Sequence, residues 1–216
     1  NSNTYIFLYA TVMVIIVAAI LSFTAMQLQP MQDKNMRLEK KQDILRAINI
    51  DTSRQAASAV YEKYIKESFV VDAKGNKVEG EEAFEINMKE QMDKPEQARI
   101  LPVYVYKHDN TQTYILPLRG KGLWGPIWGY VALEEDFSTV YGATFDHKSE
   151  TPGLGAEIST KKFQAQFKGK QLFNKDGEFI AIEVKKGNAD PDALNEVDGI
   201  SGGTITSKGL QKMVKT

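Results

Sequence analysis

The stretch that organises this chain lies close to its C-terminal end and reads Asp198-Gly199-Ile200-Ser201-Gly202-Gly203-Thr204-Ile205-Thr206-Ser207. Its three glycines permit positive φ angles and let the backbone approach a ligand closely. Leu210, Met213 and Val214 follow at helical spacing, and Thr204, Thr206 and Ser207 are available as N-caps, so the loop is expected to lead into a helix. A helix N-terminus attracts phosphate through its unpaired N–H groups and its dipole. The alternative is an ordinary glycine-rich turn that binds nothing.

Several other functions are disfavoured by the composition of the 216 residues. The glycine spacing matches neither the Gly-x-x-x-x-Gly-Lys-Ser/Thr loop nor Gly-x-Gly-x-x-Gly, so nucleotide hydrolysis is not expected. A net charge of −1 leaves no basic excess for nucleic acid. The chain has no cysteine and only two histidines, His108 and His147, which excludes thiolate metal sites and disulfides and argues against a histidine-rich metal site. His147 is expected to face solvent rather than act as a base.

The N-terminal 32 residues carry no charged side chain, and Tyr5 to Phe23 form a nearly continuous apolar run. Such a run is long enough to cross a bilayer. A cleaved signal peptide is the rival interpretation, but no basic segment precedes the run and no Ala-x-Ala-like site follows it. Residues 33–46 contain five basic and three acidic side chains, which by the positive-inside rule would place the following domain in the cytoplasm.

The next segments predict helices and then strands. Residues 35–48 are expected to form a helical stalk, and Asp51 to cap a helix that buries Ala56, Ala59, Val60 and Tyr64. Hairpins are expected at 69–78 and at 100–118, and strands up to Leu133, at 137–145 and at 177–185. The charged residues 79–97 are expected to form a solvated loop, with a contact to a partner protein as the alternative. Ser159 is expected to cap a short helix that ends at Phe167. The pattern indicates an α+β fold with an antiparallel sheet.

Three motifs resemble a known family of FMN-binding domains. Residues 198–204 resemble the motif Asp, two variable residues, Ser/Thr-Gly-Ala-Thr, at which that family carries FMN through a phosphoester to the last threonine, here Thr204. Gly203 replaces the usual alanine and is expected to loosen the loop. Gly122-Leu123-Trp124 and Glu-Thr-Pro-Gly-Leu-Gly at 150–155 resemble two further segments of the family, which lie against the flavin. For Trp128 a core position is equally open, and for Trp124 it is the weaker alternative.

The resemblance implies a set of cofactor-binding residues. They belong to the threonine motif, the Gly-Leu-Trp segment and the Thr-Pro-Gly-Leu-Gly loop: Ser201, Gly202, Gly203, Thr204, Thr206, Ser207, Gly122, Leu123, Trp124, Thr151, Pro152, Gly153, Leu154 and Gly155. It also implies that a flavin transferase attaches the cofactor from FAD, with Asp198 needed for that reaction. The alternative role for Asp198 is an Asx turn with the loop that follows it.

The whole chain resembles the family of C subunits of Na⁺-translocating NADH:quinone oxidoreductases, with the G subunits of Rnf complexes as the nearest alternative. This implies a single-pass protein of the inner membrane with its flavin domain on the outer face, other subunits as partners, and electron transfer as its task. A basic segment ahead of residue 1 would reconcile this orientation with the charge pattern. The expected divisions are a transmembrane helix at 1–30, a stalk at 31–50 and an FMN-binding domain at 51–216. A cofactor-free binding or sensor domain and a flavin enzyme with its own substrate stay open as alternatives.

Overall fold

Five strands of eight or more residues form the centre of the structure, which is a computed structural model that describes residues 3–108 and 111–215. Along β5 (Pro126–Leu133), Tyr130 and Ala132 enter one hydrophobic cluster, whereas Val131 and Leu133 enter the other. This two-residue period is the geometry of a strand. Both faces of the sheet are therefore covered.

The sheet has six strands in the order β2-β1-β3-β4-β5-β6, and every neighbouring pair is antiparallel. Besides β5, its members are β1 (Ile65–Asp72), β2 (Lys77–Val78), β3 (Ile100–His108), β4 (Thr111–Lys121) and β6 (Val140–His147). The antiparallel sheet and the hairpins at β1–β2 and β3–β4 confirm the α+β expectation.

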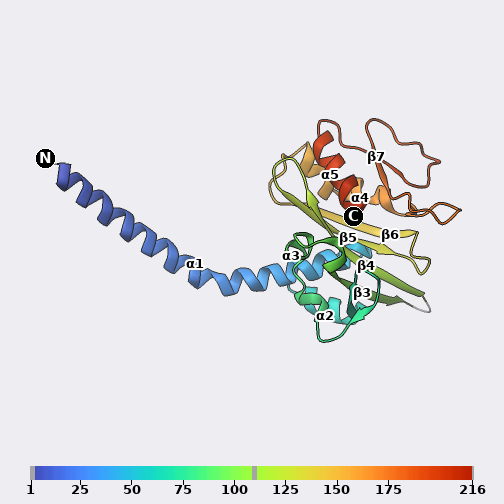
Figure 1. Cartoon of the computed structure of the whole chain (residues 1–216), viewed down its shortest axis with the longest axis horizontal. Coiled ribbons are helices and arrows are strands. Elements are labelled where there is room, and N and C mark those ends of the chain that lie inside the picture. The colour runs from blue at the N-terminus through green and yellow to red at the C-terminus, as the bar shows by residue number, and fades with distance from the viewer. Residues whose placement is uncertain (1–2, 109–110, 216) are drawn as a thin grey trace. The chain divides into compact units, whose positions relative to one another are not determined.

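One face of the sheet packs on the C-terminal part of the chain. There lie η3 (Gly155–Ser159), α4 (Lys161–Gln164), η4 (Ala165–Phe167), α5 (Thr204–Val214) and a small parallel pair of strands, β7 (Glu183–Lys185) and β8 (Glu196–Asp198). Figure 1 shows α4, α5 and β7 together on this side of the sheet. Leu210, Met213 and Val214 are buried in its cluster, as their helical spacing predicted.

The opposite face packs on the end of α1 (Asn3–Ala47) and on α2 (Ala57–Tyr64). Ile44, Leu45 and Ala47 of α1 are fully buried there. Three short helices follow the first hairpin where a loop was expected: η1 (Ala83–Glu85), α3 (Met88–Met92) and η2 (Glu96–Ala98).

The chain divides into two compact units at Lys40, Asn1–Lys40 and Lys41–Thr216. The first is the apolar part of α1, which is long and apolar enough to cross a membrane. Residue 30, the expected end of the span, is a proline inside the uninterrupted helix. Residues 41–47 of the expected stalk belong to the folded unit, because their side chains form part of its core.

Four local predictions were wrong because tertiary contacts override the pattern. Asp51 caps no helix; its carboxylate pairs with Lys161, and α2 begins at Ala57 without a side-chain cap. Ala59 is exposed, whereas Val60 and Tyr64 pack on the core as predicted. Thr160, not Ser159, caps α4 by accepting from the N–H of Phe163.

The fourth concerns residues 177–185, of which only 183–185 form a strand. The N–H groups of Ile180 and Ala181 both donate to the carbonyl of Leu172, and Ala181 has a φ of +52°. A left-handed residue ends the alternation of an extended chain. Phe179 is consequently exposed, while Ala181 and Ile182 are both buried.

Candidate functional site

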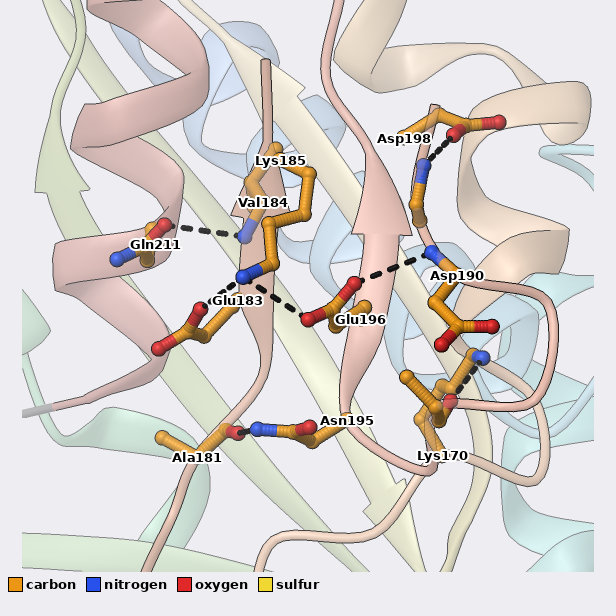
Figure 2. A network of polar contacts seen from close by, with 12 residues as sticks. Lys170, Ala181, Glu183, Val184, Lys185, Asp190, Asn195, Glu196, Asp198 and Gln211 are labelled. Carbon is orange, nitrogen blue, oxygen red and sulfur yellow. Dashed lines mark hydrogen bonds and ion pairs between the residues drawn. The ribbon is translucent and has the colours of Figure 1, made fainter. Parts of the chain in front are cut away.

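The Asp198–Ser207 motif rests on the parallel β7–β8 pair. β8 ends at Asp198, and the N–H of Gly199 donates to the carbonyl of Lys185 at 2.7 Å. The ammonium of Lys185 lies between Glu183 and Glu196, 2.8 and 2.9 Å from their carboxylate oxygens (Figure 2). These hydrogen bonds lower the pKa of both glutamates. These ion pairs hold strands β7 and β8 together at the point where the loop begins.

A tight turn then leads into α5. The N–H of Gly203 donates to the carbonyl of Ile200 at 3.0 Å, and Gly202 has a φ of +74°. A Cβ on Gly203 would lie 2.9 Å from Cγ2 of Ile200. Gly203 is therefore closely packed against Ile200.

The first turn of α5 leaves three N–H groups without an acceptor among the described residues, those of Thr204, Ile205 and Thr206. The N-cap is Gly203, which has no side chain, so the expected hydroxyl cap is absent. Ser207 instead accepts from the N–H of Ile200 at 3.1 Å. Free N–H groups at the positive end of a helix dipole suit an anion.

A pocket of about 570 Å³ opens beside the half-buried Thr204. Both sides of the motif contribute to its walls, which include Lys186, Asp198, Ser201, Gly202, Thr204, Ser207 and Lys208. Oδ1 of Asp198 accepts from the N–H of Ala189 at 2.6 Å. Its carboxylate thus holds the loop before β8, rather than forming an Asx turn with the loop after it.

One buried carboxylate joins the three motifs. Glu150 is 5% exposed; its Oε1 accepts from the N–H of Trp124 at 2.8 Å, and its Oε2 accepts from the hydroxyl of Thr206 at 2.6 Å. A Cβ on Gly122 would lie 2.5 Å from Oε1, and one on Gly155 would overlap Oε2. A larger residue at position 122 or 155 would therefore collide with the Glu150 carboxylate where it now lies.

The outer surface of the same region is apolar. Leu123, Trp124, Leu154 and Ile205 are all exposed, Trp124 by 66% and Leu154 by 41%. A Cβ on Gly202 would lie 2.5 Å from Cδ2 of Leu154, so the Leu154 side chain already contacts the threonine motif. Exposed apolar groups gathered beside a polar site are typical of a ligand-binding surface. Trp124 is not a core residue, and Trp128 is half-buried.

Comparisons with known proteins agree with this geometry. Residues 122–216, which contain all three motifs, match the FMN-binding domain family. The chain is 35% identical to the C subunit of the Na(+)-translocating NADH-quinone reductase of Haemophilus ducreyi, over 93% of this chain and 84% of that protein. It is 30% identical to the corresponding protein of Pseudomonas aeruginosa, over 99% and 90%. The chain belongs to the family of C subunits of Na⁺-translocating NADH-quinone reductases.

A solved structure from this C-subunit family supports the same fold. The crystal structure of the Parabacteroides distasonis protein superimposes with a TM-score of 0.79 at 45% identity, covering 87% of this chain and 91% of that one. The fold of the family therefore includes both the sheet and the C-terminal layer that carries the motif.

The structure brings together most, not all, of the residues expected to hold the cofactor in this family. Thr204, Ser201 and Gly202 share one pocket, and Gly122, Gly155 and Thr206 meet at Glu150. Thr206 is buried and directed away from the pocket. Thr151, Pro152 and Gly153 are exposed, and the N–H of Gly153 donates to Glu157 at 3.1 Å. These three form the turn that presents Leu154.

Glu150 has a role that its place in the sequence motif does not predict. Its partners lie 26 and 56 residues away in the chain, so neither contact leaves a local pattern. The sequence offers only one sign of this role, a single carboxylate directly before a glycine-rich turn. His147 is half-buried, and its Nδ1 accepts from the N–H of Glu150 at 3.2 Å, which gives it a structural role. Among the described residues no group of three His, Cys, Asp or Glu side chains forms a metal site.

Proposed function

We propose that this chain is a membrane-anchored flavoprotein subunit that carries FMN through a phosphoester to Thr204 and relays electrons within a Na⁺-pumping NADH:quinone oxidoreductase. One observation carries the proposal. Thr204 is the first residue of α5, and its hydroxyl lies at a helix end whose N–H groups at 204, 205 and 206 have no acceptor among the described residues. A hydroxyl at such a position is placed to carry a phosphate.

The residues around Thr204 fit a phosphoester. Its remaining negative charge would be held by the free N–H groups, and the Lys186 and Lys208 side chains line the same pocket. Successive N–H groups at a helix start form a concave anion site. The 570 Å³ pocket beside Thr204 leaves room for the phosphate and the adjoining ribityl chain.

Attachment requires a transferase and FAD, and it transfers the FMN group from FAD to Thr204. Oγ1 of Thr204 bonds to the phosphorus on the flavin side of the FAD diphosphate. The bond from that phosphorus to the bridging oxygen breaks, AMP leaves, and the hydroxyl proton passes to a base or to solvent. Asp198 lines the same pocket, and we assign it to this reaction as a metal or proton partner.

The bound flavin supplies electron transfer, because hydride and one-electron chemistry belong to its ring. The residues of this chain position the ring and limit its contact with water. Leu123, Trp124 and Leu154 provide an exposed apolar surface next to the motif. The covalent bond at Thr204 would keep the cofactor from dissociating between turnovers.

The assembly and the location follow from the relatives and the helix. The relatives of this chain are named as parts of a multi-subunit NADH-quinone reductase, so we infer other subunits as its partners. The apolar part of α1 would cross the inner membrane once. We place the flavin domain on the outer face, where the transferase would act.

Expression with and without a flavin transferase tests this function. With the transferase, we expect yellow protein that stays coloured after denaturation and acid precipitation, with an intact mass raised by one FMN. Without it, we expect colourless protein of unmodified mass. Colourless, unmodified protein in both cases would contradict the proposal and favour a cofactor-free binding domain.

A further inference from the structure

The Glu150 carboxylate is buried and is held by neutral donors. It is 5% exposed, and no Lys, Arg or His side chain of the described part of the chain forms an ion pair with it. Burying a charge is costly unless hydrogen bonds satisfy it. Here two donors form these hydrogen bonds with the carboxylate, the Trp124 N–H at 2.8 Å and the Thr206 hydroxyl at 2.6 Å.

Each donor belongs to a different element of the site. Trp124 follows β4 in the turn that presents the exposed indole, and Thr206 is the third residue of α5. Glu150 itself follows β6, and its own N–H donates to His147 at 3.2 Å. One carboxylate therefore joins the end of the sheet, the apolar surface and the first turn of the motif helix.

The packing around the carboxylate leaves little freedom. Gly155 has no room for a Cβ, which would lie 2.6 Å from Oγ1 of Thr206 and would overlap Oε2 of Glu150. The α5 backbone also lies close to β4, since a Cβ on Gly209 would overlap the carbonyl of Lys121. Thr204 and Thr206 are two positions apart in the first turn of α5, so their side chains leave the helix on different sides. A bond that holds Thr206 therefore fixes the helix backbone from which Thr204 projects.

We propose that Glu150 is the positioning residue for esterification of Thr204. It holds the first turn of α5 through Thr206 and sets the Trp124 turn beside it, so that the acceptor hydroxyl meets the incoming FAD in a reactive orientation. Glu150 does not contact Thr204 or the phosphate and acts only through Thr206 and Trp124. This inference rests on the proposed function, since it concerns the attachment reaction.

The test is the rate of flavin attachment by the transferase in matched variants of the full chain. Glu150→Gln keeps the shape, but its amide offers one acceptor where two are needed. Thr206→Val removes only the donor, and Thr206→Ser restores it. Because misplacing a nucleophile lowers the chemical step, we expect kcat for attachment to fall about 10- to 100-fold in Glu150→Gln and Thr206→Val. The KM for the acceptor protein should stay unchanged, and Thr206→Ser should keep most of the wild-type rate.

Two controls separate positioning from general damage. Glu157→Gln changes a carboxylate that binds the N–H of Gly153 in the same loop, and it should react like the wild type. The double variant Glu150→Gln/Thr206→Val should lose less than the sum of the two single losses, because both changes disturb the Glu150–Thr206 bond, while Glu150→Gln also disturbs the contact with Trp124. Circular dichroism must show each variant folded at the assay temperature. If Glu150→Gln does not fold, the Thr206→Val and Thr206→Ser pair carries the test.

Hydrogen exchange distinguishes the failure of this inference from failure of the proposed function. We expect protection to fall at the hydrogen-bonded N–H groups of Trp124 and Ser207 in Glu150→Gln, and at that of Ser207 in Thr206→Val, with or without flavin. A folded Glu150→Gln protein with the wild-type kcat would overturn the positioning role. So would a loss confined to KM, or additive losses in the double variant. Wild-type protein that never acquires flavin would instead overturn the attachment proposal itself.

Discussion

At the scale of single residues, two roles are compatible with the position of Asp198. Its carboxylate lines the Thr204 pocket, and the same group accepts from the N–H of Ala189 at 2.6 Å. The first fact suits a role in attachment, and the second suits a brace for the loop before β8. Only a change that alters charge and keeps the acceptor oxygen distinguishes them.

We expect Asp198→Asn to lose flavin attachment as completely as Asp198→Ala. The amide still accepts from Ala189 but can neither bind a metal ion well nor take up a proton. Intact mass after co-expression with the transferase measures the modified fraction. Normal modification of the Asn variant, with loss only in the Ala variant, would reduce Asp198 to a structural brace.

The exposed apolar side chains of the site allow a second residue-scale prediction. A buried Trp or Leu replaced by Ala costs about 2–5 kcal/mol of stability. At exposed positions the change usually stays within about 0.5 kcal/mol. Trp124 and Leu154 are exposed by 66% and 41%, so their Ala variants should unfold at nearly the wild-type denaturant concentration in flavin-free protein.

The flavin-loaded forms of Trp124→Ala and Leu154→Ala should differ from the wild type in absorbance band shape and midpoint potential. Water would reach the ring where the side chain is removed. The half-buried Trp128 is the control, since Trp128→Ala should lose more stability and leave the spectrum unchanged. A large loss of stability in Trp124→Ala with an unchanged flavin spectrum would contradict the assignment.

At the scale of elements, the sequence predicts the parts of this fold whose burial follows a regular period. The β-branched and aromatic runs at 100–106 and 113–118 became β3 and β4, and the apolar spacing after Thr204 became the buried face of α5. Where a long-range contact interrupts the period, as at Ala181 or Asp51, no local pattern marks the interruption. The role of Glu150 could not be predicted for the same reason, because it depends on long-range contacts with Trp124 and Thr206.

The β7–β8 pair predicts a dependence on pH. Hydrogen bonds from Lys185 lower the pKa of Glu183 and Glu196 below their usual value of 4.5. A carboxylate with a lowered folded-state pKa stabilises the fold above its unfolded pKa, and this stabilisation is lost as the pH falls through the folded value. The groups are on the surface, so the effect on stability should be small.

Lys185→Gln should therefore raise the pKa of both glutamates, as measured by NMR titration of their side-chain carboxyl carbons. It should also lower hydrogen-exchange protection at Gly199 near neutral pH, because Gly199 donates to the carbonyl of residue 185. Lys175→Gln is the matched control, since Lys175 is exposed and forms no ion pair among the described residues. Unchanged glutamate titration in Lys185→Gln would show that the ion pairs do not persist in solution.

At the scale of the whole molecule, the two units have separate tasks. The first is an apolar helix that suits a bilayer, and the second contains the sheet and the whole candidate site. The charge pattern after the apolar run and the family resemblance indicate opposite orientations. The absence of cysteine from the chain makes the orientation directly measurable.

A single cysteine at the exposed Lys175 should react with a membrane-impermeant maleimide in intact spheroplasts, if the domain lies on the outer face. Cysteine-free protein is the blank, and a second variant, Lys74→Cys at the exposed β1–β2 turn, should label equally. Labelling of either cysteine only after lysis would place the domain in the cytoplasm, as the positive-inside count suggests.

The central claim is the bond between Thr204 and the flavin phosphate, and peptide mapping after co-expression with the transferase tests it most directly. Cleavage at lysine releases residues 187–208, which contain Ser201, Thr204, Thr206 and Ser207, and fragmentation assigns the modified side chain. We expect one FMN on Thr204 of the wild type and none on a folded Thr204→Ala variant. An adduct on another side chain, or on the Thr204→Ala protein, would contradict the account.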